Sequence, residues 1–125
     1  MRSLMQLNEL VNRVFSADKN IRYVGIIKRG PKFDLLESRM REGMKSLTPD
    51  KTDREFSEII PQIILGAAER LENDLGRITY SLIGYEKLSL VFFKTPKYTV
   101  ILSVEAGIPV TPIYERVRSL LELEQ

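Results

Sequence analysis

The sequence predicts an α+β fold of the α/β/α sandwich type: a five-stranded antiparallel sheet flanked by three helices, in the order α-β-β-α-β-β-β-α. Three observations predict it. Apolar residues recur with the period of a helix in three segments, five short segments rich in apolar and β-branched residues end at turn signals, and the last three of these follow one another closely. Because amphipathic helices must bury one face, we expect them to cover the sheet.

The composition limits the functional classes. The chain has 125 residues with no Cys and no His, so residues 1–125 are interpreted as one domain without disulfides, thiolate or histidine metal sites, or histidine-based triads. Carboxylate-bound magnesium and lysine or tyrosine chemistry stay open on composition alone. We expect no catalytic residue, no metal site and no cofactor. No apolar run is long enough to cross a bilayer and the first residues lack a secretory signal, so a cytoplasmic location is expected.

The first part of the chain is expected to form a helix and then a hairpin. Four apolar residues share the helical face: Leu4, Leu7, Val11 and Val14. The segment from Ile21 to Lys28 is apolar on both faces, as central strands are. A turn signal at Gly30-Pro31 leads into a second strand over residues 33–37. Residues 38–47 lack periodicity and are interpreted as an exposed, basic connection.

The second helix has the clearest pattern in the chain. Its apolar residues follow the i, i+3, i+4, i+7 rule without a miss: Phe56, Ile59, Ile60, Ile63, Ile64, Ala67, Ala68, Leu71 and Leu75. Two starts are possible, at Thr48-Pro49 or at Thr52, where Glu55 completes a capping box. Pro61 is expected to kink the helix and Gly76 to end it.

The rest of the chain is expected to form a three-stranded meander and a last helix. The strands are predicted over residues 77–85, 88–94 and 98–105, with turns between them. Thr111 and Pro112 begin the last helix, which turns four apolar residues inward: Ile113, Val117, Leu120 and Leu121.

This order of elements resembles that of the roadblock / dynein light chain family, which is related in shape to profilin-like and longin domains. The best match runs from about residue 56 to the end and includes Ala67-Ala68-Glu69-Arg70-Leu71 and Leu75-Gly76. The layout is also similar to that of small uncharacterised archaeal proteins. The resemblance implies a homodimer or heterodimer surface on the second helix and third strand. It also implies a non-enzymatic scaffold or regulatory module, which in some members acts on a small GTPase or a signalling complex.

The apolar stripe of the second helix spans about 180°, wider than a contact on one side needs. One edge is therefore expected to pack on the sheet and the other on a partner, although the sheet and the basic connection together are an alternative cover. The third strand carries no proline, so at a sheet edge it invites a partner strand; a twisted, solvated edge is the alternative. The predicted interface comprises Ile60, Ile64, Ala68, Leu71, Leu75, Thr79 and Ser81.

Basic residues around the hairpin form a second candidate, a patch for an anionic partner. Its members are Lys28, Arg29, Lys32, Arg39, Arg41 and Lys45. A solvated loop is the alternative, because Asp34, Glu37 and Glu42 dilute the charge. The net charge of +2 does not indicate nucleic acid, which is not expected to bind. A small-molecule sensor of the PAS, GAF or profilin-like type, with its ligand between sheet and helices, is the alternative function, and a nucleic-acid binder ranks third.

Overall fold

The computed structural model describes residues 4–28, 34–48 and 50–123. Its centre is a five-stranded sheet in which every neighbouring pair is antiparallel, in the order β2-β1-β5-β4-β3. The strands are β1 (Ile21–Lys28), β2 (Asp34–Met40), β3 (Ser81–Gly84), β4 (Leu88–Lys94) and β5 (Tyr98–Glu105). The β1–β2 hairpin and the β3–β4–β5 meander are joined through β1 and β5, and the predicted antiparallel sheet is confirmed.

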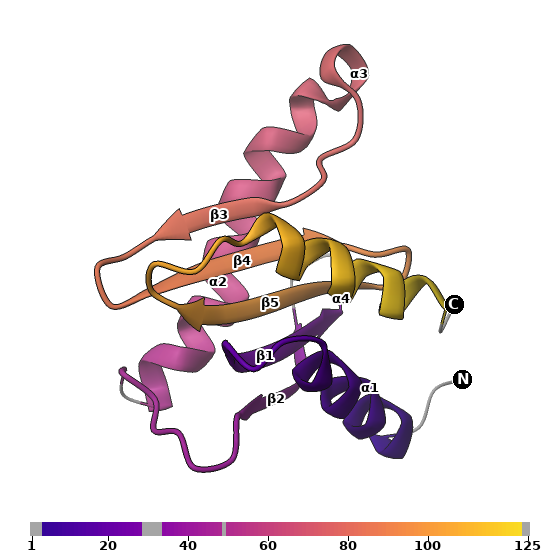
Figure 1. The fold of residues 1–125 in the computed structure, drawn as a ribbon. Helices are drawn as coiled ribbons and strands as arrows, with labels where there is room; N and C mark the ends of the chain where they lie inside the picture. Colours follow the sequence, from indigo (N-terminus) through magenta and orange to yellow (C-terminus); the bar gives the residue numbers. More distant parts are fainter. Residues whose placement is uncertain (1–3, 29–33, 49, 124–125) are drawn as a thin grey trace.

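Helices lie on both faces of this sheet. They are α1 (Leu4–Ala17), α2 (Asp50–Ala68), the 3₁₀ turn η1 (Glu69–Leu71), the short α3 (Glu72–Leu75) and α4 (Thr111–Leu123). In Figure 1, α1 and α4 lie in front of the sheet, whereas α2 crosses behind it and carries α3 out beyond β3. We call the α1/α4 side the front face and the α2 side the rear face. The predicted sandwich of three main helices and one sheet is confirmed.

The strands direct alternate side chains to two cores of unequal size. The front core joins α1 and α4 to the sheet through buried residues that include Val11, Val14, Val24, Phe93, Leu102 and Val117. Where burial is described, the rear core has four buried members, Ile27, Leu65, Phe92 and Ile101, with half-buried neighbours around them. One helix covers the rear face where two cover the front, so more of the rear face is left for other contacts.

Two strands differ from the prediction. Residues 38–40, predicted to be part of an exposed connection, belong to β2 and pair with Tyr23, Val24 and Gly25 of β1. The strand β1 is long enough to pair with these residues, and backbone hydrogen bonds between strands form independently of the side chains of the edge strand. The third strand is shorter than residues 77–85, because Tyr80 does not join the ladder. Its ring packs 4.7 Å from that of Tyr114 and its hydroxyl lies 2.8 Å from that of Thr111 in α4.

The second helix ends where the sequence predicts, although not as one regular helix. It begins at Asp50, in agreement with the first of the two predicted starts, and continues through Pro61 to Ala68. The chain then tightens into η1 and α3 before Gly76, whose positive φ of 87° favours glycine. The N–H of Gly76 donates to the carbonyl of Glu72 over 2.9 Å and closes this last turn.

Candidate interaction surface

The helix α2 places part of its apolar stripe on the sheet and leaves part exposed. Leu65 is completely buried in the rear core, and Ile60 and Ile64 are half-buried against it. Ile59 and Ile63 lie on the opposite side of the stripe, and 64% of the Ile63 side chain is exposed. Among the described residues, the outward edge of α2 is therefore formed by isoleucines that the fold itself does not cover.

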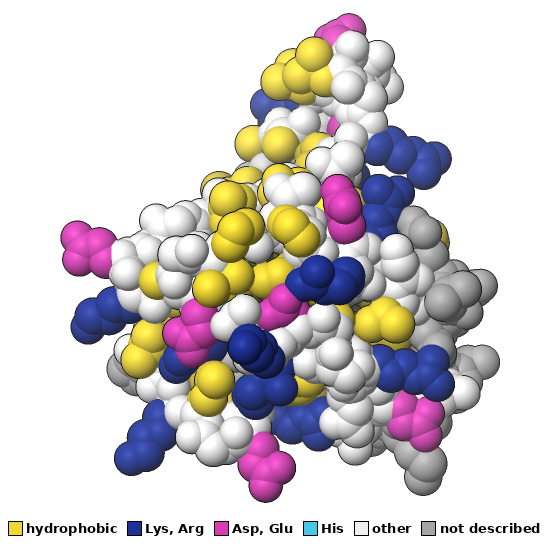
Figure 2. Space-filling view, in the orientation of Figure 1, with side chains coloured by type: hydrophobic (Ala, Val, Ile, Leu, Met, Phe, Trp, Pro, Cys, Tyr) yellow, Lys and Arg dark blue, Asp and Glu magenta, His cyan; other side chains and the backbone are white. Residues whose placement is uncertain are grey.

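The projecting end formed by η1 and α3 continues this apolar edge. Leu71 is 54% exposed and Leu75 is 78% exposed. Figure 2, in the orientation of Figure 1, shows hydrophobic side chains gathered on the projecting end. Large apolar side chains gathered on a surface are typical of a contact with a partner.

An ion pair fastens this projecting end to the sheet. The Lys94 ammonium of β4 donates to both carboxylate oxygens of Glu72, each at 3.0 Å, and Glu69 lies 3.9 Å from the same ammonium. One of the Glu72 oxygens also accepts the backbone N–H of Ile78 over 2.9 Å. The carboxylate thus holds both the helix end and the chain that leaves it, which fixes the direction in which the exposed leucines point.

The strand β3 forms the sheet edge beside this projection. It pairs only with β4 in the described sheet, so the outer side of its backbone has no partner strand there. Leu82 and Tyr85 are exposed at this edge, and neither a proline nor a lysine lies within the strand. An edge of this kind can pair with a strand of another molecule.

The structure divides the predicted interface residues into two groups. Leu71, Leu75 and Thr79 are exposed, whereas Ile60, Ile64, Ala68 and Ser81 are half-buried. Thr79 precedes β3 instead of lying within it. The exposure of Ile59 and Ile63 was not predicted, because the periodic pattern omitted Leu65, the residue that sets the buried side of α2.

The predicted basic patch is distributed over different environments. Lys28 and Lys45 are exposed, and Arg29 and Lys32 lie outside the described residues. Arg39 donates to the side-chain oxygen of Asn8 over 3.0 Å and to that of Asn12, both on α1. Its guanidinium thus has partners within the chain, as does that of Arg41.

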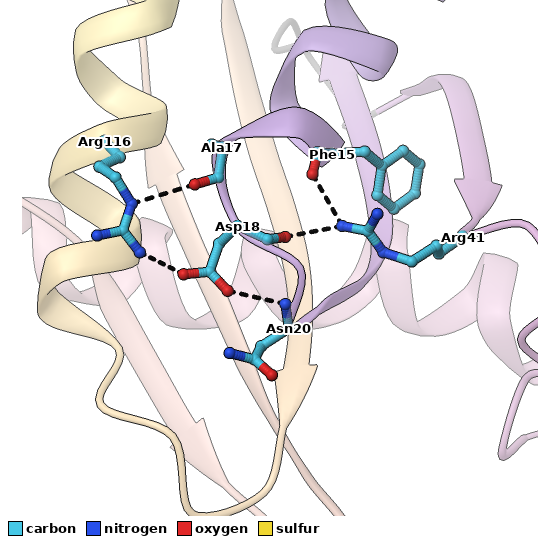
Figure 3. Close-up of polar contacts among 6 residues, drawn as sticks. All are labelled: Phe15, Ala17, Asp18, Asn20, Arg41 and Arg116. Atoms are coloured by element: carbon cyan, nitrogen blue, oxygen red, sulfur yellow. Dashed lines mark hydrogen bonds and ion pairs between the residues drawn. The ribbon is translucent and has the colours of Figure 1, made fainter.

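Arg41 and a second arginine hold the end of α1 (Figure 3). The Nη2 of Arg41 donates to the carbonyls of Phe15 and Asp18 at 2.8 and 2.7 Å, and its Nε donates to that of Ile21 at 2.7 Å. Arg116 of α4 donates to the Ala17 carbonyl over 3.1 Å and pairs with the Asp18 carboxylate. The Phe15 and Ala17 carbonyls belong to the last turn of α1, where carbonyls have no N–H partners within the helix, so these guanidiniums have a structural role.

The Asp18 carboxylate gives this junction a pH dependence. Burial raises its pKa, but the backbone N–H of Asn20 at 2.8 Å and the Arg116 guanidinium outweigh that effect, so the pKa lies below its ordinary value. A lowered pKa stabilises the fold above the pKa of the unfolded chain, and this stability is lost as pH falls through the folded value. We expect Asp18→Asn to lower the urea midpoint at pH 7, and the difference from wild type to shrink progressively below about pH 4. A difference that grows on acidification would contradict this prediction.

Metal-binding clusters and membrane-spanning helices are not found in the described part of the chain. No three of its His, Cys, Asp or Glu residues are grouped so that they could hold a metal ion. Of the helices that the structure describes, none has both the length and the apolar character needed to cross a membrane.

Three solved structures show what this fold is similar to. A structure of MglB with tetrameric arrangement has a TM-score of 0.74, with 98% of this chain and 89% of that chain covered at 15% identity. The gliding protein MglB from Thermus thermophilus gives 0.65 at 13% identity, over 95% of this chain and 87% of that one. MglC from Myxococcus xanthus gives 0.59 at 14% identity, over 94% of both chains.

The chain has the roadblock-type fold. No protein-family model matches its sequence, and a comparison with curated proteins finds no match. The fold-level expectation from the sequence is thus confirmed by structures that share only 13–15% of its residues.

Proposed function

We propose that this chain is a non-enzymatic regulatory scaffold that forms a homodimer through α2, α3 and β3. The observation that carries the proposal is the row of exposed apolar side chains from Ile63 through Leu71 to Leu75, beside the open edge of β3. Of the predicted interface residues, Leu71 and Leu75 belong to this row, Ile60, Ile64 and Ala68 are half-buried in α2, and Thr79 and Ser81 precede or begin β3. A second copy related by a two-fold axis would cover both rows at once, because such an interface uses the same patch on each subunit.

The expected energies favour such an interface. Covering a largely exposed Leu or Ile contributes about 1.5–3 kcal/mol, and the row supplies several on each copy. This sum exceeds the lower values of the cost of association, which is about 4–15 kcal/mol. Pairing of two β3 edges would add backbone hydrogen bonds and would set the register. The tetrameric arrangement of MglB is a further support, since that protein shares this fold.

The partner proposed for the dimer is a protein, with a small GTPase as the first candidate and a cytoplasmic location. The support is the roadblock resemblance, together with the fold shared with the gliding protein MglB. Lys28 and Lys45 are exposed, which makes them available to an anionic surface of a partner protein. Residues 1–125 would act as one domain without a catalytic residue of their own.

Two exposed leucines provide a matched test of the dimer. Leu71 is 54% exposed within the row and Leu47 is 52% exposed outside it, so replacing either by Glu costs the folded monomer little. We expect wild type and Leu47→Glu to have a mass near twice 14.4 kDa by light scattering after gel filtration. The dissociation constant of the Leu71→Glu dimer should be at least about tenfold higher than that of the wild-type dimer, because two carboxylates would be buried at the interface. A wild-type monomer at every concentration would refute the dimer, and a Leu71→Glu variant that associates as wild type does would refute its location.

A further inference from the structure

The backbone of β3 offers hydrogen bonds to a partner strand at two residues. The N–H of Tyr85 donates to the carbonyl of Leu88 over 2.8 Å, so these two residues form a hydrogen-bonded pair at the end of β3. Hydrogen-bonded and non-hydrogen-bonded pairs alternate along an antiparallel ladder. In the register of β3 with β4, Leu82 and Gly84 are therefore the residues whose N–H and carbonyl groups point away from β4, toward the open edge.

The side chains of β3 alternate between the two faces of the sheet. Leu82 pairs with Val91 of the front core, so its side chain lies on the front face, where it is 50% exposed. Ile83 lies on the rear face, half-buried against the rear core. Gly84 shares the front face with Leu82, and a Cβ there would meet no atom within 4 Å outside its two chain neighbours. The front of this edge thus has one large exposed side chain and, two residues further on, an open space.

The opposite edge of the sheet, along β2, is less open. The N–H of Arg41 donates to the carbonyl of Arg22 over 2.7 Å, and by the same alternation the N–H of Ser38 points outward. The Glu37 carboxylate already accepts this N–H over 3.2 Å. The ladder of β1 with β2 also contains a bulge. Bulges and charged side chains protect sheet edges from pairing, so we expect a further strand to add at β3 and not at β2.

A second copy of β3 is the strand that this edge fits. In an antiparallel pair related by a two-fold axis, each outward residue faces an outward residue of the partner, and two outward residues allow three such registers. Two of the registers put Leu82 or Gly84 opposite its own counterpart and form one hydrogen-bonded pair within β3. The third puts Leu82 opposite the partner's Gly84 and forms two hydrogen-bonded pairs, which doubles the number of backbone hydrogen bonds.

The side chains also favour the third register. On the front face it places the Leu82 side chain beside the open space at the partner's Gly84. On the rear face it places Ile83 directly opposite Ile83 of the partner subunit, and two β-branched side chains in such a pair stabilise a sheet.

We propose that the dimer continues the sheet through β3 in this third register, with Ile83 at the two-fold axis and Leu82 opposite the partner's Gly84. This inference rests on the proposed homodimer and adds how its two sheets join. In Figure 1 the projecting end formed by η1 and α3 lies beyond β3, on the side toward which an added strand continues the sheet. The exposed Leu71 and Leu75 thus lie on the side of the second copy. Because each copy then has only its β2 edge left, strand addition stops at two copies.

Because the chain contains no Cys, a single introduced thiol reports the register. In the proposed register the thiols of the Ile83→Cys dimer face each other in a non-hydrogen-bonded pair, whose Cα separation of about 4.5 Å suits a disulfide. Under mild oxidation we expect Ile83→Cys to form a covalent dimer at least about tenfold faster than Ser38→Cys, at an exposed position of β2. Leu82→Cys and Gly84→Cys should be slower than Ile83→Cys, since each thiol lies opposite a residue that carries none. Non-reducing gels measure the covalent dimer against time.

Ser81 and Tyr85 give a second test that leaves Ile83 in place. In the same register Ser81 faces the partner's Tyr85. A mixture of Ser81→Cys and Tyr85→Cys chains should therefore form a covalent dimer, whereas neither variant alone should. Circular dichroism under reducing conditions checks the fold of each variant, because Ser81 and Ile83 are half-buried.

The possible failures of this test are distinguishable. Fastest cross-linking of Leu82→Cys or Gly84→Cys would overturn the register and keep the dimer. If no β3 variant cross-links faster than Ser38→Cys while the wild-type mass is near twice 14.4 kDa, strand pairing is overturned and the dimer is left to the helices. Rapid cross-linking of Ser38→Cys would show that the β2 edge pairs as well and would overturn the closed dimer. A wild-type monomer at every concentration would refute the proposed homodimer itself, and the register with it.

Discussion

Replacing Arg41 by alanine is expected to lower the free energy of unfolding by about 3 kcal/mol. Three carbonyls, of Phe15, Asp18 and Ile21, would lose the same charged donor, at distances of 2.7 to 2.8 Å. The guanidinium also lies 5.0 Å from the centre of the Phe15 ring, so packing is lost as well. The end of α1 and the start of β1 are joined through this one side chain. Urea unfolding monitored by circular dichroism gives the difference.

Arg39 supplies the control, because it lies two residues away and reaches the same ring at 5.8 Å. Its guanidinium binds the exposed side chains of Asn8 and Asn12 instead of backbone carbonyls. Exposed contacts of this kind contribute little, so Arg39→Ala should cost only about 0.5–1 kcal/mol. An equal loss of unfolding free energy in the two variants would show that the carbonyl contacts of Arg41 contribute no more than the exposed contacts of Arg39.

The same pair of variants bears on the predicted basic patch. Arg41 is held by carbonyls, so recruiting it to an anionic partner would break contacts that end α1. Lys28 and Lys45 are both exposed, so binding an anionic partner would not require them to break contacts that end α1. If an anionic surface binds here, the exposed lysines are therefore the residues expected to respond first to mutation.

Periodicity was sufficient to predict the helices and strands, because it reports which segments alternate between apolar and polar environments. It could not predict contacts between segments. Arg41 and its acceptors Phe15, Asp18 and Ile21 are separated by 20 to 26 residues, and nothing in the local pattern joins them. The two residues of β2 nearest this contact, Arg39 and Met40, have a basic or irregular pattern that resembles a loop, yet they pair with β1 through the backbone.

The rotation of α2 shows a second limit. With apolar residues over half its circumference, several rotations about the helix axis bury a similar apolar area. The choice is made by how Leu65 meets Phe92 and Ile101 across the sheet, which is a tertiary contact. The exposure of Ile59 and Ile63 follows from that choice. The sequence indicated that the stripe is wider than one contact needs, but not which isoleucines of α2 would face outward.

This rotation makes Leu65 the residue of α2 whose truncation should have the largest effect. Leu65→Ala is expected to lower the free energy of unfolding by about 2–5 kcal/mol, since a completely buried leucine leaves a void when it is shortened. Among the described residues, the rear core has three other buried members, Ile27, Phe92 and Ile101, so few of these side chains are available to fill that void. Urea unfolding at low protein concentration measures the loss without a contribution from association.

Ile63 is the matched control, two residues away on the same helix and 64% exposed. Ile63→Ala should change the stability of the monomer by less than about 0.5 kcal/mol, because no core contact is removed. In the proposed dimer it should instead weaken association, so its effect on unfolding should grow with protein concentration whereas that of Leu65→Ala persists at every concentration. Equal losses for the two variants at low concentration would contradict the rotation of α2, and with it the outward row on which the dimer rests. A large loss for Leu65→Ala alone would fix the buried side of the helix and leave the exposed isoleucines available to a partner.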